Sequence, residues 1–439
     1  MEKLKSWVEE VLGGDYEYEV YFERKRKKLI EGSQESVEKL STSEDAGVGI
    51  RVFRNGRMGF SFTTSLEASS VKDCVKMAKE ACHITPPDEG FTLGNCKNLG
   101  ELETYYDSDG LESSLEDKIE MVINMERYAK SLDGRVKGVR NVSLNETDME
   151  VFCFSSCGLF YNYRSTWYTS SMSVLVEEGG DQSISYSYVG ARRLRDVPFQ
   201  DMVQEVVFKA TATLKPSSFE TRRMPVVLYR EACASLLEAF SPIFLGDSLV
   251  KGKTFLSGME GQQVFSEKLT IVDDGVKEKG FLSLPVDAEG HFMRRNVLVE
   301  KGRFLTFLHS TYTAIKSNAE PTGNSIRGGF KSLPVSDITN LYIEPGDRSL
   351  EDLLEQDEVF LVTDLMGLHT VDTVSGDFSL GASGIIYRKG KKEQSVRGVV
   401  IGGNIKELLS LVVDVGNDLR FYGNVGAPSL FIENLTVGG

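Results

Sequence analysis

The chain has 439 residues, of which 41% are hydrophobic and 26% are charged, a composition that indicates a folded protein and excludes a largely disordered one. A chain of this length is expected to form two domains, with three as the alternative. The formal net charge of −15 repels the phosphate backbone and disfavours direct nucleic-acid binding. No apolar run approaches the roughly 18 residues that a membrane-spanning helix needs, and Glu2, Lys3 and Lys5 open the chain without a signal-peptide pattern. We therefore expect a soluble, cytoplasmic protein without membrane contact.

The cysteine spacing carries no metal-binding pattern. Six cysteines occur at positions 74, 82, 96, 153, 157 and 233, with no CxxC pair and no zinc-finger spacing. Cys153 and Cys157 are four residues apart in a predicted strand, which favours neither a disulfide nor a helical metal pair. The sequence therefore predicts free thiols in a reducing compartment.

One segment, from Arg24 to Lys28, is strongly basic within this acidic chain. Its functional interpretation is a patch for nucleic acid or another anionic surface. Its structural interpretation is a solvated edge strand, because the run follows the alternating residues Tyr16, Tyr18, Val20 and Phe22. Lysines commonly protect edge strands from pairing with other chains, so we favour the edge strand.

The first half of the chain is predicted to combine helices with strands. Asn55-Gly56 is a strong signal for a tight hairpin. From about 139 to 194, serine, threonine and tyrosine alternate with apolar residues, which predicts a long antiparallel meander. The other expected elements are helices over 4–12, 66–83, 199–214 and from 115 onward, and strands over 16–22, 48–52 and 58–62.

The second half is predicted to be rich in short strands separated by glycine turns. Lys215-Pro216-Ser217-Ser218 is the predicted boundary between domains 1–216 and 217–439. Lys301-Gly302 predicts a tight hairpin. The other elements include a strand over 226–229, a helix over 231–240, a last helix over 405–412 and a closing strand over 429–432. The expected fold is α+β, with an N-terminal mixed helix and sheet domain and a C-terminal β-rich, barrel-like or sandwich-like domain.

Common catalytic motifs are absent from the sequence, including the P-loop, the dinucleotide fingerprint and the GxSxG elbow. The four histidines, His83, His291, His309 and His369, are too far apart to form an HExxH zinc motif. His369 follows Asp364 and precedes Asp372 in a loop. It is therefore the candidate general base of a hydrolase that would act alone.

Several segments, taken together and in order, resemble one family. They are Gly47–Phe53, Asn55–Gly59, Leu365–Leu368, Ser375–Gly384, Ile401–Asn404, Asp414–Asp418 and Ala427–Leu430. The pattern resembles the TldD/PmbA family, whose members include metallopeptidases and proteins once described as modulators of DNA gyrase. The form of Ser375–Gly384 is similar to that of the TldE/PmbA branch.

The resemblance implies that this chain has lost the zinc site of the TldD branch. There, a helix after a short strand carries HExxxH, and a cysteine near the C-terminus completes the ligand set. Here Arg230 and Ser235 stand where the two histidines are expected, and only Glu231 remains. The cysteine region matches Phe421-Tyr422-Gly423, which has no thiol. Because a guanidinium stays protonated, Arg230 cannot bind zinc. We therefore expect no cofactor here, and zinc only in a TldD-type partner.

The implied function is that of a non-catalytic subunit. With a TldD-type chain it would form a heteromeric metallopeptidase that acts on unfolded peptides, in proteolysis, peptide maturation and antitoxin turnover; the isolated chain would alternatively form a homodimer. Two other functions stay open, a stand-alone hydrolase around His369 and a regulatory protein that modulates gyrase. Glu231 is either a catalytic remnant or a first-turn helix residue. The candidate substrate- or partner-binding residues are Gly376, Asp377, Ser379, Gly381, Ser383 and Gly384, for which hairpin turns with positive φ are the structural alternative.

Overall fold

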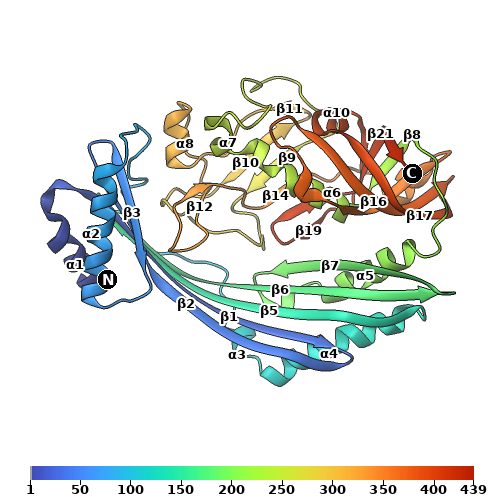
Figure 1. The fold of residues 1–439 in the computed structure, drawn as a ribbon, viewed down its shortest axis with the longest axis horizontal. Coiled ribbons are helices and arrows are strands. Elements are labelled where there is room, and N and C mark those ends of the chain that lie inside the picture. Colours follow the sequence, from blue (N-terminus) through green and yellow to red (C-terminus); the bar gives the residue numbers. More distant parts are fainter. Residues whose placement is uncertain (1) are drawn as a thin grey trace.

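A computed structural model describes residues 2–439. A long curved sheet forms most of the N-terminal half, and the C-terminal half lies over the concave side of that sheet and over one of its edges (Figure 1). Helices account for 25% of the residues and strands for 42%, which confirms the predicted α+β class. No helix in residues 2–439 is long and apolar enough to span a membrane.

The N-terminal sheet has the spatial order β3-β2-β1-β5-β6-β4, with β7 also paired to β6. All of its pairings are antiparallel except that of β4 with β6, so the predicted meander is confirmed. The sheet pairs β3 with only part of β2, from Val48 to Arg54. Its strands are β1 (Glu17–Ser33), β2 (Ser36–Arg54), β3 (Arg57–Thr63), β4 (Asn98–Glu101), β5 (Val136–Ser155), β6 (Phe160–Glu178) and β7 (Asp181–Ala191).

Helices cover the N-terminal sheet. Alternate residues of β5 and β6, including Val142, Leu144, Met172 and Val174, form an apolar core with the buried faces of two helices, α4 and α5. A second core joins α1 and α2 to the β1–β2 end of the sheet. The four helices expected in this half are confirmed. The helices are α1 (Glu2–Leu12), α2 (Ala68–Ile84), α3 (Ser108–Glu112), α4 (Leu115–Leu132) and α5 (Phe199–Ala212), with 3-10 turns at Gly13–Asp15 and Leu194–Asp196.

The basic run does not lie on an edge strand, so that prediction was wrong. It belongs to β1, which pairs with β2 on one side and with β5 on the other. Carboxylates on the two flanking strands neutralise it. On β5, Glu150 lies 2.6 Å from Arg24 and Glu146 lies 3.2 Å from Lys28, and on β2, Glu44 lies 2.6 Å from Arg26. The run is tolerated in an interior strand because these cross-strand ion pairs compensate its charge.

One disulfide, Cys96–Cys157, contradicts the prediction of six free thiols. Cys157 lies beyond the end of β5, in the turn before β6, so the assumed strand geometry did not apply to it. Its partner is 61 residues earlier, and the two Cα atoms are 5.2 Å apart. The other four cysteines, at positions 74, 82, 153 and 233, are buried free thiols, as predicted.

A closed five-stranded barrel forms the centre of the C-terminal half. Its strands follow the order β17-β16-β15-β8-β21, and β17 pairs back with β21. The barrel alternative in the prediction is therefore confirmed over the sandwich. Its strands are β8 (Arg222–Leu228), β15 (Val359–Met366), β16 (Asp377–Arg388), β17 (Lys391–Asn404) and β21 (Leu430–Gly438). Helix α6 (Arg230–Phe240) follows β8 and contributes Ala232, Leu236 and Phe240 to the same core.

Shorter elements complete this half. A second sheet has the order β11-β10-β9-β14-β20-β19, and β10 and β11 form the hairpin predicted at Lys301-Gly302. Its strands are β9 (Ile271–Asp274), β10 (Arg295–Glu300), β11 (Arg303–Phe304), β14 (Leu341–Ile343), β19 (Arg420–Tyr422) and β20 (Val425–Ala427). The remaining elements are strands β12 (Ser325–Ile326), β13 (Val335–Ser336) and β18 (Val412–Val415), helices α7 (Gly246–Val250), α8 (Thr311–Lys316), α9 (Leu350–Leu354) and α10 (Ile405–Ser410), and 3-10 turns at Ser241–Phe244 and Leu368–Thr370. The last predicted helix is shorter than expected because β18 begins at Val412.

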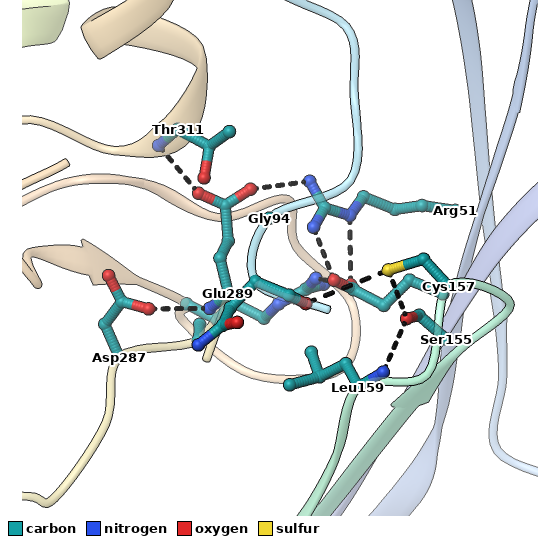
Figure 2. A network of polar contacts seen from close by, with 12 residues as sticks. Arg51, Gly94, Ser155, Cys157, Leu159, Asp287, Glu289 and Thr311 are labelled. Carbon is teal, nitrogen blue, oxygen red and sulfur yellow. Dashed lines mark hydrogen bonds and ion pairs between the residues drawn. The ribbon is translucent and has the colours of Figure 1, made fainter. Parts of the chain in front are cut away.

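A buried ion-pair network ties the two halves together (Figure 2). Arg51 on β2 donates to both carboxylate oxygens of Glu19 on β1, at 3.0 and 2.5 Å, and to Glu289 of the C-terminal half at 3.1 Å. Glu289 in turn accepts a hydrogen bond from the backbone N–H of Thr311 at 2.9 Å. Because each buried charge has a partner of opposite sign, the network fixes how the C-terminal half sits on the sheet.

Candidate functional site

The predicted site residue Glu231 lies in a buried cluster of charged side chains where the two halves meet. Helix α6 begins at Arg230, immediately after β8, and so places Arg230 and Glu231 in its first turn. Helix α5 packs beside β7 and carries further charges into the same place. We call this group the junction cluster; its members are Ser187, Glu205, Lys209, Arg230, Glu231, Asp364, Arg420 and Tyr422.

Lys209 is the centre of one part of the junction cluster. Its Nζ atom lies 3.0 Å from Glu231 Oε2 and 3.0 Å from Asp364 Oδ1, and it donates to the carbonyl oxygen of Tyr186 at 2.7 Å. The hydroxyl of Ser187 donates to Glu231 at 3.1 Å. All three hydrogens of the ammonium group therefore have acceptors.

Burial and mutual attraction together set the pKa values of Lys209 and Glu231. Burial raises the pKa of Glu231 to about 7, against the opposing attraction of Lys209. Burial alone would lower the pKa of Lys209, but Glu231 and Asp364 outweigh it and hold that pKa above its ordinary value. A carboxyl that titrates near neutral pH is suited to general acid or base chemistry, and it also arises in buried structural ion pairs.

Glu205 is the centre of the other part of the junction cluster. Its fully buried carboxylate accepts hydrogen bonds from Arg230 Nε and from the hydroxyl of Tyr422, both at 2.8 Å. Arg420 Nη1 lies 3.3 Å from its second oxygen. Burial opposes the charge on Arg230, but Glu205 outweighs it and raises the pKa of the guanidinium. Three cations thus balance the three carboxylates of the cluster.

The junction cluster does not fit a zinc ion. Its carboxylates are already paired with fixed cations, and lysine and arginine side chains do not ligate metals at neutral pH. The nearby thiol of Cys233 is buried, and burial raises its pKa far from the thiolate range. Within residues 2–439 there is no group of three or more histidine, cysteine, aspartate or glutamate side chains placed to hold a metal.

The three residues of the alternative hydrolase site do not contact one another. His369 is exposed on the 3-10 turn after β15. Asp364 instead pairs with Lys209. Asp372 accepts hydrogen bonds from the backbone N–H groups of Val374 and Ser375, which lower its pKa. In the part of the chain that the structure describes, His369 therefore lacks the carboxylate partner that would orient it as a base.

The glycine-rich segment forms most of β16, between β15 and β17 of the barrel. Gly376 has φ +87°, which a turn requires, whereas Gly381 and Gly384 lie in extended strand. A Cβ atom at Gly384 would lie 1.8 Å from the carbonyl oxygen of Leu361, so this glycine permits close approach of the chain's own β15. Asp377 accepts from Asn404 at 2.8 Å and from Ser375 at 2.9 Å, Ser379 is exposed, and Ser383 is buried.

Two residues that sequence reasoning missed are Glu205 and Lys209. They are four residues apart on a predicted helix, the spacing of an ordinary surface ion pair. Their neighbours argue against a surface ion pair, because Val206 and Ala210 lie on the same buried face of the helix. A glutamate and a lysine within an apolar helix face indicate partners elsewhere in the fold.

Comparison with known proteins accounts for nearly the whole chain. Models of the PmbA/TldA metallopeptidase domain 1, central domain and C-terminal domain match residues 18–82, 108–214 and 221–439. The chain belongs to the PmbA/TldD family. The resemblance noted in the sequence is therefore confirmed.

Relatives named PmbA and relatives named TldD both match this chain. It is 28% identical to metalloprotease PmbA of Escherichia coli O157:H7 over 410 residues, 92% of this chain and 88% of the relative. It is 26% identical to a metalloprotease TldD homologue of Buchnera aphidicola over 428 residues, 90% of this chain and 87% of the relative. Overall identity does not separate the branches, so the residues of the junction cluster carry more weight.

Solved structures of PmbA/TldD relatives share the complete fold. A Thermotoga maritima protein, described as a candidate modulator of a DNA gyrase, superposes with a TM-score of 0.89 at 26% identity, covering all of both chains. TldE from Thermococcus kodakarensis superposes with a TM-score of 0.88 at 24% identity, again over all of both chains, and at that identity the likeness concerns the fold alone.

Proposed function

We propose that this chain is the non-catalytic subunit of a heteromeric peptidase, in which a TldD-type chain supplies the zinc and cuts unfolded peptides. The observation that carries the proposal is the pairing of Glu231 with Lys209 and of Glu205 with Arg230. The TldD-type zinc motif would need histidines at positions 230 and 235, where this chain has Arg230 and Ser235. A fixed positive charge stabilises each carboxylate that a metal cation would otherwise neutralise.

Electrostatics argues against zinc binding at this place. A divalent cation beside Glu231 would lie within a few ångströms of the Lys209 ammonium, because the two side chains are in contact. In a site of low effective dielectric constant such repulsion amounts to several kcal/mol. The junction cluster is therefore better suited to join α5, α6 and β15 than to perform hydrolysis.

Free strand edges give the subunit a means of holding an extended peptide. β3 pairs with β2 only from Val48 onward. Residues 36–46 of β2 therefore have no strand paired to their outer side within residues 2–439. A peptide in extended conformation can add to such an edge through backbone hydrogen bonds, which give affinity with little sequence preference. This supports a role in presenting peptides to the catalytic chain.

In this proposal the protein acts in the cytoplasm and does not bind DNA directly. Four of the five basic residues of β1 are paired with carboxylates, which are Glu150, Glu23, Glu44 and Glu146. These ion pairs leave little free charge for a phosphate backbone. Any effect on gyrase would then be indirect, through peptide turnover.

The test is co-purification of the tagged chain from its native cell, followed by peptide cleavage with the separated and recombined subunits. We expect a near-stoichiometric TldD-type chain with an intact HExxxH, and cleavage only when both chains are present. His369→Ala should leave that cleavage unchanged, whereas loss of the partner's histidines should abolish it. Zinc bound to the isolated chain together with turnover, whether the chain is a monomer or a homodimer, would contradict the proposal.

A further inference from the structure

A cavity of about 330 Å³ lies between the concave face of the N-terminal sheet and two loops of the C-terminal half. This volume is within the roughly 300–1,000 Å³ that small-molecule sites occupy. The sheet side presents residues of β1, β5 and β6, and the other side is closed by the loop 281–293 and by residues 325–327, which include strand β12. The junction cluster contributes none of the lining residues, so this cavity is a separate feature of the fold.

Aromatic side chains form one part of the cavity wall. Trp167 and Tyr163 come from β6, and Phe281 comes from the loop after β9. The indole N–H of Trp167 donates to the carbonyl oxygen of Phe281 at 2.8 Å, which holds the two residues next to each other. An aromatic wall of this kind favours a flat apolar group.

Cations form the other part of the wall. Lys25, Lys27 and Arg327 line the cavity against a single carboxylate, Glu23. Lys25 is paired with Glu23 at 3.1 Å, whereas Lys27 is exposed and has no ion pair within residues 2–439. Because Glu23 balances Lys25 and Glu19 balances Arg327, the uncompensated charge in the cavity wall is that of Lys27, and it marks a place for an anion.

Arg327 adds an unused hydrogen-bond donor. Its side chain is 1% exposed, and its two terminal nitrogens donate to Glu19 and to the carbonyl oxygen of Ser332. Its Nε atom is buried without an acceptor among the residues that the structure describes. A buried N–H without an acceptor is energetically unfavourable, so an acceptor brought by a ligand would relieve that penalty.

The aromatic and cationic parts are close enough for one ligand. The strand register places Lys27 opposite Thr147, and Thr147 opposite Trp167, so all three lie in one row across β1, β5 and β6. Two strand spacings separate the backbones of Lys27 and Trp167 by about 10 Å. The lysine stem spans much of that gap, which leaves room for a ring and a carboxylate joined by a few bonds.

We propose that this cavity binds an aromatic carboxylate, with its ring against Trp167 and Phe281 and its carboxylate on the cations Lys25, Lys27 and Arg327. The source of that group is the C-terminal aromatic residue of a peptide. The peptide source rests on the proposed function, whereas the recognition of an aromatic carboxylate does not.

The test uses the isolated full-length chain. The protein has two tryptophans, so the variant Trp7→Phe makes Trp167 the sole indole reporter. We titrate this variant with Ala-Ala-Phe, its C-terminal amide, Ala-Ala-Ala and 3-phenylpropionate, following fluorescence and calorimetry. We expect saturable binding of Ala-Ala-Phe, with the amide and Ala-Ala-Ala at least about tenfold weaker, because charge-assisted hydrogen bonds and ring burial are each lost.

A matched pair of variants locates the site. Lys27→Gln should weaken Ala-Ala-Phe binding about tenfold. Lys39→Gln, which changes an exposed lysine of β2 outside the cavity, should not. Absence of saturable binding, or equal binding of the amide, would overturn carboxylate recognition, and 3-phenylpropionate binding as tightly as the tripeptide would overturn the peptide source. Since no partner chain takes part, either result is independent of whether the chain pairs with a TldD-type subunit.

Discussion

Lys209 and Glu231 form a buried ion pair, with Nζ and Oε2 3.0 Å apart, and the same ammonium group lies 3.0 Å from Asp364. Lys209 belongs to α5 of the N-terminal half, whereas Glu231 and Asp364 belong to α6 and β15 of the C-terminal half. One lysine therefore neutralises two carboxylates and joins the two halves of the molecule. Its position also holds the Glu231 carboxylate in an ion pair between the two halves.

Removing the Lys209 charge should destabilise the protein strongly. Lys209→Met keeps most of the side-chain volume but leaves two carboxylates uncompensated, which costs about 3–5 kcal/mol for a buried pair. Lys215→Met is the control, because Lys215 pairs with Glu178 at the exposed surface and such pairs contribute about 1 kcal/mol or less. Urea unfolding of the three proteins measures the difference. Equal stability of both variants would show that the ion pair is not a structural tie.

The Glu231 carboxyl should make stability depend on pH. Its pKa is about 7 in the folded state, above its ordinary value of 4.5, so the folded state holds this proton more tightly than the unfolded state does. The stabilisation is fully present below pH 4.5 and is lost as pH rises through 7. Relative to Glu231→Gln, the wild type should lose up to about 3 kcal/mol between pH 5 and pH 8. If the free energies of unfolding of the two proteins change in the same way from pH 5 to pH 8, the raised pKa of Glu231 is contradicted.

Local patterns in the sequence were sufficient to predict most helices and the meander, because apolar periodicity reports which face of an element is buried. The same periodicity predicted α5 but not the role of Glu205 and Lys209. Their partners, Arg230 and Asp364, are 25 and 155 residues away along the chain. No local pattern can show such a contact.

The sequence also could not predict which strands pair with one another. The basic run of β1 was assigned to an edge because charge patterns report exposure, whereas the number of paired sides depends on β5, more than a hundred residues later. The barrel likewise depends on the pairing of β8 with β21, about 200 residues apart. Cys96 and Cys157 meet only because the β5–β6 turn and the segment before β4 are folded together.

The Arg51 network should control how firmly the two halves are held together. Arg51→Met removes the cation that pairs with buried Glu289, while Glu19 keeps its ion pair with Arg327, at a cost of about 3–5 kcal/mol. Hydrogen exchange should accelerate around Thr311, whose N–H donates to Glu289. Arg54→Met, three residues along the same strand, removes a surface ion pair with Asp15 and a hydrogen bond to the hydroxyl of Tyr16, and it should leave that exchange unchanged. Identical exchange in both variants would contradict a role of Arg51 in joining the halves.

The Cys96–Cys157 disulfide should contribute to stability where it forms. It closes a loop with a sequence separation of 61 residues, for which the chain-entropy relation gives about 4 kcal/mol. Reductant, or the double variant Cys96→Ser with Cys157→Ser, should therefore lower the urea midpoint, whereas Cys74→Ser, at a buried free thiol, should respond to reductant as the wild type does.

Thiol counting under denaturing conditions decides whether the disulfide exists in the cell. Protein purified without reductant after alkylation at lysis should show four reactive thiols if the bond is present, because four of the six cysteines are free in the structure. Six reactive thiols would mean that the native compartment keeps Cys96 and Cys157 reduced, as the cytoplasm does. In that case the turn carrying Cys157 is held by hydrogen bonds, such as those from Ser155 N–H to the carbonyl oxygen of Leu159 at 3.1 Å and from Tyr18 N–H to the hydroxyl of Ser156 at 3.0 Å.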